Sequence, residues 1–268
     1  MGAGAVDDDE YGEIADLYDY VVPYRERADV AFFVDAALVA GGPVLEVGCG
    51  TGRILIPTAR AGVDVTGVDL SPRMLGVCRR RLDGEPEQVR RRARLVQADM
   101  RRFDLEQRFT LATIPFRPFQ HLLTVEHQLA CLASVRAHLA DAGTLIVDLF
   151  NPSLDALASF RIGEEGGEEP EFTMPDGRRV VRTHRILAVD RFNQVNDIEL
   201  IYRVTHPGGR KERLLHRFPM RYVFRFEMEH LLARTGFRVE HLYSDFEKHP
   251  YGHAYPGELI FVARKTKD

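Results

Sequence analysis

The stretch VLEVGCGTGR, residues 44–53, decides the fold of this chain. Its first four residues form a largely apolar, strand-like run, and glycines follow at positions 48, 50 and 52 where a helix is about to begin. Glycine lets the backbone turn sharply and approach a ligand that any Cβ would push away. The stretch therefore predicts a buried strand, a tight turn and the start of a helix, with a ligand held against the turn.

The spacing of these glycines argues against a dinucleotide. A nicotinamide or flavin site needs glycines at the first, third and sixth positions, with a pyrophosphate at the helix N-terminus. Here the sixth position is Arg53, and an acidic residue, Glu46, stands two positions before the first glycine. This arrangement suits a ligand with a cationic end and no pyrophosphate.

Outward from this turn, residues 43–152 alternate strand-like runs with helical periodicity, which is the pattern of a parallel sheet with crossover helices. The expected strands are 44–47, 63–68, 94–97, 109–114 and 144–149.

Two carboxylates follow neighbouring strands of this predicted sheet, Asp69 at the end of the second and Asp99 after the third. A carboxylate at the first place can accept both ribose hydroxyl protons of an adenosine, and one at the second can accept from the exocyclic amine of an adenine. The alternative is that both are caps or turn residues.

After Pro152 the pattern changes to alternating apolar and polar positions, which predicts an antiparallel insert with strands 179–189, 197–205 and 213–224. The second and third strands have one apolar face, and their opposite face collects Arg203, Arg217, Arg221 and Arg225. Because an apolar face must be covered, the insert predicts a homodimer contact unless the core domain covers it.

The last part of the chain returns to the α/β pattern, with a helix over 227–235 and strands over 237–243 and 259–263. The expected organisation is N-terminal helices and a cofactor-binding core over 1–160, the insert over 161–226, and the closing elements of the core over 227–268.

Composition and charge narrow the classes of function. Hydrophobic residues make up 45% and charged residues 28%, no apolar run is long enough for a bilayer, and the acidic start at residues 7–10 is unlike a signal peptide. We expect a cytoplasmic protein with no membrane contact. A net charge of -4 gives no general attraction for nucleic acid, and three widely spaced cysteines predict neither disulfides nor a metal site.

Three motifs in register resemble those of the class I S-adenosylmethionine-dependent methyltransferases: E-x-G-x-G-x-G at 46–52, D-L-S-P-x-M-L at 69–75 and D-M at 99–100. The resemblance spans nearly the whole chain. It implies a Rossmann-like, seven-stranded, mostly parallel sheet with a reversed last strand, and S-adenosylmethionine as cofactor, with S-adenosylhomocysteine as product.

The same resemblance assigns cofactor contacts, with Glu46 near the methionine ammonium, Asp69 on the ribose, and Asp99 with Met100 at the adenine. The expected cofactor-binding residues are Glu46, Gly48, Cys49, Gly50, Gly52, Asp69, Leu70, Met74, Asp99, Met100 and Pro115.

The segment 114–122, after the fourth predicted strand, lies at the edge that faces the ligand in open α/β folds. It lacks the (Asp/Asn)-Pro-Pro-(Tyr/Phe) quartet and the Pro-Cys nucleophile of base-modifying enzymes. Its His121-Leu122 pair, the insert and the Tyr18-Asp19 pair in an N-terminal helix resemble the sugar-amine N-methyltransferases, in which such a histidine and tyrosine face the acceptor.

His121 and Tyr18 are therefore the candidate catalytic residues. An imidazole with an unperturbed pKa of roughly 6.5 can accept the acceptor's proton near neutrality. The alternatives are that His121 caps the helix beginning near Thr124 or fills space, and that Tyr18 packs rather than shapes the acceptor pocket.

Two other segments are candidates for the acceptor site. The arginine face of the insert would suit an acidic acceptor such as a nucleotide-linked sugar, although a solvated strand face is the commoner arrangement. Residues 249–256 combine His and Tyr with loop formers, and without carboxylates at ligand spacing their two histidines predict no metal.

The sequence thus predicts an enzyme that moves a methyl group from S-adenosylmethionine to an amine or hydroxyl of a small-molecule acceptor. One alternative is a protein or RNA methyltransferase of the same fold. The other is a catalytically inactive protein that only binds S-adenosylmethionine.

Overall fold

A computed structural model describes residues 11–12 and 14–267. Its core elements are η1 (Tyr18–Tyr20), α1 (Val22–Arg25), α2 (Asp29–Ala40), β1 (Val44–Val47), α3 (Leu55–Arg60), β2 (Val65–Asp69), α4 (Pro72–Asp83), α5 (Glu87–Arg90), β3 (Ala93–Gln97), β4 (Phe109–Ile114), η2 (Pro118–His121), α6 (Val125–His138), β5 (Leu139–Phe150), α8 (Arg225–Arg234), β10 (Phe237–Tyr243) and β11 (Glu258–Lys265). Between β5 and α8 lie α7 (Leu154–Ser159), β6 (Phe172–Thr173), β7 (Arg179–Asp190), β8 (Val195–Thr205) and β9 (Lys211–Arg221).

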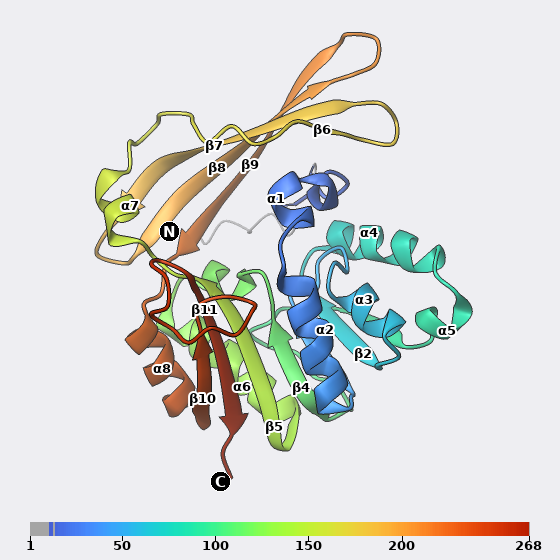
Figure 1. Cartoon of the computed structure of the whole chain (residues 1–268), viewed down its shortest axis with the longest axis vertical. Coiled ribbons are helices and arrows are strands. Elements are labelled where there is room, and N and C mark those ends of the chain that lie inside the picture. The colour runs from blue at the N-terminus through green and yellow to red at the C-terminus, as the bar shows by residue number, and fades with distance from the viewer. Residues whose placement is uncertain (1–10, 13, 268) are drawn as a thin grey trace, which may run out of the picture.

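Seven strands form the core sheet in the order β10-β11-β5-β4-β1-β2-β3 (Figure 1). β11 pairs antiparallel with both β5 and β10, whereas the other pairs are parallel. The expected Rossmann-like sheet with a reversed last strand is confirmed. Because β1, β2, β3 and β4 are parallel, the loops that follow them meet at one edge of the sheet.

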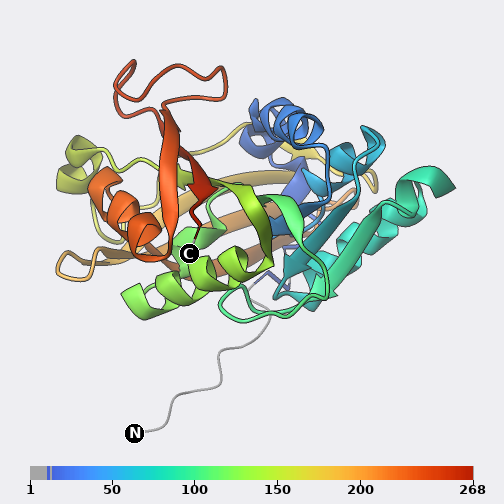
Figure 2. The same cartoon turned by 90° about the horizontal axis from the view of Figure 1, so that it is seen from below.

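Helices cover both faces of this sheet because side chains of each strand alternate between two apolar clusters. On one face, residues such as Leu45 and Val147 pack with α6 and α8. On the other, Val44 and Ile146 pack with α2, α3 and α4. Figure 2, seen from below, shows blue α2 and green α6 on opposite sides of the sheet.

The expected insert forms a separate four-stranded antiparallel sheet in the order β6-β7-β8-β9. It crosses above the carboxyl end of the core sheet, with η1 and α1 lying between the two sheets (Figure 1). The short strand β6 was not expected, and β9 ends at Arg221 rather than continuing to Phe224, which instead precedes α8. The core strand β5 extends beyond the expected 144–149 at both ends.

The apolar face of the insert is covered within the same chain. Ile14, Leu17 and Val21 of the N-terminal segment form one buried cluster with Tyr202 and Val204 of β8. Because this face is covered within the chain, it no longer indicates a dimer contact, and a homodimer stays a prediction. The division of the chain into 1–160, 161–226 and 227–268 also stays a prediction, with β6 to β9 falling inside its middle part.

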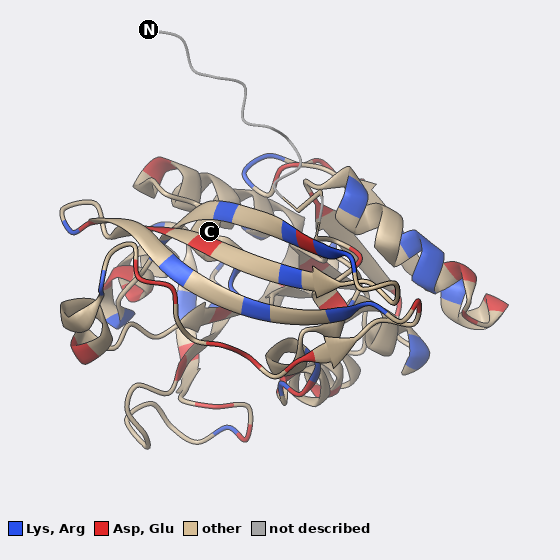
Figure 3. Ribbon diagram, turned by 90° about the horizontal axis from the view of Figure 1, so that it is seen from above, with Lys and Arg blue, Asp and Glu red and all other residues tan. Residues whose placement is uncertain are grey.

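On the opposite face of the insert lie Arg203 of β8 and Arg217 of β9, whereas Arg225, expected on the same face, begins α8. Figure 3, seen from above, marks the basic positions along the insert strands in blue. The sequence pattern did not indicate the acidic residue that lies beneath these arginines. Glu199 is fully buried on this face and pairs with Arg185 at 2.6 Å and with Arg217. Arg203 pairs with Glu165 at 2.5 Å. The arginines are thus tied to carboxylates, which fits a structural face better than a free anion site.

None of the helices that the structure describes has the length and apolar character needed to cross a bilayer.

Candidate active site

A cavity of about 550 Å³ lies where β1, β2, β3 and β4 end. Ten of the eleven residues expected to bind the cofactor line it, and so do Tyr18 and His121. The exception is Gly52. Tyr11 and Pro219 of β9 also line the cavity, so the N-terminal segment and the insert both contribute to its wall.

Three glycines make the turn after β1, and each has a positive φ: 74° at Gly48, 50° at Gly50 and 80° at Gly52. Their surroundings differ. A Cβ on Gly48 would lie 2.7 Å from Pro118, and one on Gly50 would lie 3.2 Å from the Met74 methyl across the cavity. A Cβ on Gly52 would lie 2.5 Å from the Cys78 sulfur. Gly52 was expected to bind the cofactor, but it does not line the cavity. It instead allows close packing of the turn on α4.

Glu46 is buried at the end of β1 and lines the cavity. No residue that the structure describes donates a hydrogen bond to its carboxylate. Burial raises the pKa of Glu46 well above its usual value, opposed by the charge of Arg53. A buried carboxylate without donors is costly when ionised, so this place suits a cationic ligand group that would offset its charge.

Asp69 joins the end of β2 to the glycine turn. Its carboxylate accepts hydrogen bonds from the backbone N–H of Gly50 at 2.7 Å and of Ser71 at 2.9 Å. Burial raises the pKa of Asp69, and these N–H groups oppose that rise. Asp69 is therefore a turn residue, which was the alternative to a ligand-binding role. It also lines the cavity, so the two roles are compatible. A carboxylate has about four acceptor sites, so that of Asp69 can also accept from a ligand hydroxyl.

Asp99 lines the cavity, as do Met100 and Arg101. The Arg101 side chain donates to its carboxylate at 2.8 Å, and the Arg101 N–H donates at 2.8 Å. Burial raises the pKa of Asp99, but these hydrogen bonds outweigh burial and hold it below its usual value. Asp99 is therefore an ionised acceptor at neutral pH.

The loop after β4 is held in an unusual conformation. Phe116 and Arg117 have φ values of 63° and 74°, in the left-handed region that costs a non-glycine residue of order 1 kcal/mol. The Phe116 N–H donates to Asp148 of β5 at 3.1 Å, and Arg117 pairs with Glu258 of β11 at 3.1 Å. These contacts hold the Phe116 ring at the cavity wall.

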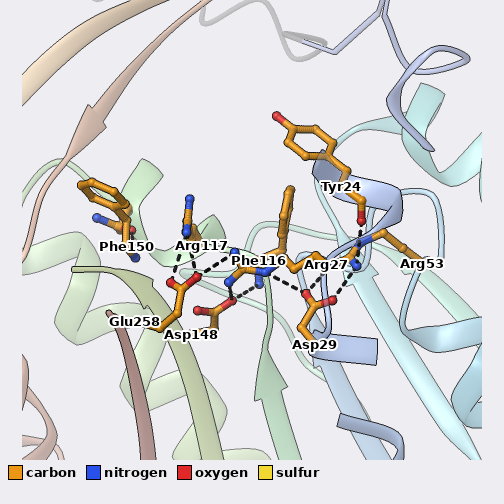
Figure 4. A network of polar contacts seen from close by, with 10 residues as sticks. Tyr24, Arg27, Asp29, Arg53, Phe116, Arg117, Asp148, Phe150 and Glu258 are labelled. Carbon is orange, nitrogen blue, oxygen red and sulfur yellow. Dashed lines mark hydrogen bonds and ion pairs between the residues drawn. The ribbon is translucent and has the colours of Figure 1, made fainter. Parts of the chain in front are cut away.

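Arg27 connects this loop to the rest of the site (Figure 4). Its guanidinium pairs with Asp148 at 2.8 Å, with Glu258 at 3.0 Å and with Asp29 at 3.2 Å. Asp29 in turn binds Arg53, which leads back to the glycine turn. The network joins α2, β5 and β11 behind the cavity, and no sequence pattern pointed to it.

Tyr18 lines the cavity, whereas the neighbouring Asp19 contacts the glycine turn. The half-buried Tyr18 ring lies 4.9 Å from that of Tyr24 and 6.1 Å from that of Phe116. Burial raises the pKa of Tyr18 well above its usual value, so its hydroxyl stays protonated. Asp19 accepts from the Thr51 hydroxyl at 2.7 Å, which ties η1 to the turn.

His121 lies at the end of η2, with the Tyr11 hydroxyl 3.4 Å from its Nε2. It does not cap α6, because the Thr124 side chain does so by accepting from the His127 N–H at 3.2 Å. Burial lowers the pKa of His121 to about 4. The expectation of an ordinary value near neutrality was therefore wrong: His121 is neutral at pH 7 and a weaker base than expected.

The low pKa of His121 predicts a loss of stability in mild acid. The unfolded chain takes up a proton near pH 6.5 and the folded chain only near pH 4, so the free energy of unfolding falls as pH drops through this window. His121→Leu removes the shifted group and should remove up to about 3 kcal/mol of this fall. Urea unfolding at pH 7.5, 6 and 5 measures it, and equal pH slopes in both proteins would contradict it.

Two segments proposed for the acceptor site lie elsewhere. None of residues 249–256 lines the cavity; His249 pairs with Asp245 at 2.9 Å, and the Tyr255 hydroxyl accepts from the Leu154 N–H at 2.8 Å. None of the four arginines of the arginine face lines it either. Within the described part of the chain no three metal-ligating side chains gather, and the absence of a metal stays a prediction.

Four residues at or beside the site had no role predicted from the sequence: Tyr11 and Arg53 line the cavity, and Tyr24 and His216 contact its lining residues Tyr18 and Tyr11. Arg53 had the strongest signal, since it directly follows the glycine turn, and it stacks on Phe116 at 4.7 Å. Tyr11 and His216 had none, because their neighbours are remote in sequence.

Residues 44–143 match a family model described as a methyltransferase domain. A Streptomyces fradiae protein, dTDP-3-amino-3,6-dideoxy-alpha-D-glucopyranose N,N-dimethyltransferase, is 36% identical over 146 residues. This match covers 52% of this chain and about half, 54%, of that relative. The dTDP-3-amino-3,4,6-trideoxy-alpha-D-glucopyranose N,N-dimethyltransferase of Streptomyces venezuelae is 28% identical over 85% of this chain and 91% of its own length.

A solved structure shares the whole architecture. It is that of S-adenosylmethionine-bound CalS10, an amino pentose methyltransferase from Micromonospora echinaspora involved in calicheamicin biosynthesis. The two structures superpose with a TM-score of 0.70 at 26% identity, covering 93% of this chain and 97% of CalS10.

Proposed function

We propose that this chain, which belongs to the class I S-adenosylmethionine-dependent methyltransferases, methylates the amine of a nucleotide-linked amino sugar. One observation carries the proposal: a single cavity runs from Glu46 and Asp69 to Tyr18 and His121. It offers a place for a cationic, ribose-bearing donor at one end and for an acceptor at the other. The named relatives that act on sugar amines support the choice of acceptor.

The residues present fit S-adenosylmethionine. Glu46 is a buried carboxylate that would hold its ammonium, and Asp69 would accept from its ribose hydroxyls. Asp99 would accept from its adenine amine beside Met100. The turn at Gly48 and Gly50 leaves room that a Cβ would fill.

When bound, the cofactor supplies a methyl group already activated on a sulfonium, so the chain's main task is to position the acceptor nitrogen. A neutral His121 can accept a hydrogen bond from the acceptor amine and orient its lone pair. Tyr18 and Phe116 would enclose the reacting atoms and exclude water. With a pKa of about 4, His121 is suited to orienting a neutral amine, whose excess proton leaves to water after transfer.

The test is methylation itself. The chain is incubated with S-adenosylmethionine and dTDP-linked 3-amino sugars, matched hydroxyl sugars, a peptide panel and tRNA, and each product is identified by mass spectrometry. We expect mass gains of one or two methyl groups on the amino sugars alone. Methylation of only peptides or tRNA would overturn the acceptor. Cofactor binding without S-adenosylhomocysteine formation on any acceptor would favour the binding-only alternative.

Asp69→Ala should weaken S-adenosylmethionine binding by roughly 1.5–3 kcal/mol, about 10- to 150-fold, because a charge-assisted hydrogen bond is lost. Isothermal titration calorimetry measures the change. Asp64→Ala is the matched control, since Asp64 lies just before the other end of β2 and pairs only with Arg92 among the described residues. Equal affinity in Asp69→Ala and wild-type protein would remove Asp69 from the cofactor site.

We infer that the chain uses neither nucleic acid nor membrane, in keeping with its net charge of -4, and that it works in the cytoplasm. A homodimer rests only on the argument from the insert, which the packing of residues 14–21 weakens.

A further inference from the structure

His216 of β9 is a buried histidine that the proposed reaction has not used. Its side chain is on the face of the insert that looks toward the core, and the residue is 2% exposed. Neither ring nitrogen has a hydrogen-bond partner among the residues that the structure describes. Each unpaired buried polar group costs of order 1–3 kcal/mol, so such a ring is expected to meet a polar group from outside the described chain.

His216 lies beside the catalytic candidate His121, although it does not itself line the cavity and is separated from it by Tyr11. Its ring centroid is 4.6 Å from that of Tyr11 and 4.7 Å from that of Phe218. The His121 ring contacts the same two residues, at 6.4 Å and 5.3 Å. The two histidines therefore flank one aromatic pair, although they come from η2 and from β9 and are far apart in the sequence.

The chemistry of His216 narrows what it can bind. Burial, together with the charges of His121 and Arg182, lowers the pKa of His216 to about 3, so the ring is neutral at pH 7. A neutral imidazole presents one N–H donor and one acceptor nitrogen. A hydroxyl also donates and accepts, so it can pair with either nitrogen. A phosphate can only accept, and a neutral ring offers it no charge-assisted hydrogen bond.

We propose that His216 binds the acceptor, by hydrogen bonding to a hydroxyl on a carbon next to the amine that His121 orients. This inference rests on the proposed function, because it assigns to the same site a substrate class: amines flanked by a hydroxyl. Tyr11 now lies against both rings, with its hydroxyl 3.4 Å from His121 Nε2. Acceptor binding requires the Tyr11 side chain to turn away, and its hydroxyl marks where a hydrogen-bonding group of the acceptor would lie.

The test compares wild-type protein, His216→Phe and His216→Gln with dTDP-3-amino-3,6-dideoxyglucose as acceptor. His216→Phe keeps a planar ring without polar atoms and should raise the acceptor KM about tenfold, the loss of one or two neutral hydrogen bonds. His216→Gln keeps a donor and an acceptor and should recover much of that loss. The Kd for S-adenosylmethionine should not change. His184→Phe, an exposed position on the same insert, is the matched control.

A second acceptor separates binding from packing. An analogue that lacks hydroxyls on both carbons next to the amine should react equally well with wild-type protein and His216→Phe. Because His216 has no described partner to lose, His216→Phe should also leave the melting temperature at or above that of the wild type.

Three results would overturn the inference: an unchanged acceptor KM in folded His216→Phe, an equal loss with the hydroxyl-free analogue, or a lowered melting temperature that accounts for the whole loss of activity. If His216→Phe does not fold, His216→Ala is tested instead. An unchanged preference of that variant for the hydroxyl-bearing acceptor over its analogue would also overturn the inference. No methylation of any amino sugar by the wild type would instead overturn the proposed function, and this inference with it.

Discussion

Gly50→Val is expected to abolish S-adenosylmethionine binding, with a Kd at least about a thousandfold above that of the wild type. A Cβ at this position would lie 3.2 Å from the Met74 methyl, and the two further methyl groups of valine extend into the cavity. The φ of 50° is also poor for a β-branched residue. Displacing the backbone would loosen the Gly50 N–H bond to Asp69 as well.

Strain alone could destabilise this variant, so the control must carry strain without a blocked cavity. Gly62 provides it, because its φ is 92° and a Cβ there meets no atom within 4 Å. Gly62→Val should lose stability and keep cofactor affinity. Calorimetry and thermal melting on both variants separate the two effects, and cofactor binding by folded Gly50→Val at wild-type affinity would contradict the assignment of the cavity.

His121→Ala is expected to lower kcat by roughly 10²–10⁴-fold, the range for a positioned catalytic group, while leaving the Kd for S-adenosylmethionine nearly unchanged. Since His121 is neutral above about pH 5, the ratio of wild-type to variant rates should stay constant between pH 6.5 and 8.5. A ratio that rises through pH 6.5 would show that the imidazole titrates in this range, and base catalysis would replace orientation.

His138 is the matched control for loss of a buried histidine. It is the buried last residue of α6, does not line the cavity, and its ring bonds the Leu105 N–H at 2.9 Å and the Ser134 carbonyl at 2.7 Å. His138→Ala should lower the melting temperature and leave kcat per folded molecule intact. Full activity of folded His121→Ala would end the catalytic assignment and make Tyr18 the next residue to test.

Local sequence determined the frame of the site. The run from Val44 to Gly50 specifies a strand and a turn because its apolar pattern and positive-φ requirement act over a few residues, and β1 has the predicted bounds. Ser71 and Pro72, a typical N-cap and first-turn pair, likewise begin α4. Since parallel strands end at one edge of a sheet, Glu46, Asp69 and Asp99 could be placed together from the order of the strands alone.

The reversed strand was predicted from the family resemblance and not from the periodicity of the sequence. Strands 237–243 and 259–263 were expected from their composition, but nothing in either says that β11 enters between β5 and β10. The position of β11 places Glu258 beside Arg27 and Arg117. Glu258 thereby becomes part of the network that holds the Phe116 loop.

Tertiary structure alone decided what covers each face and which remote side chains meet. Alternation along β8 and β9 shows which residues share a face, but not that Ile14 and Leu17 pack on one side or that Glu199 is buried on the other. The pKa of His121 depends on that packing, because desolvation is a property of all surrounding elements together. Its contact with Tyr11 spans 110 positions, a separation over which no local pattern carries information.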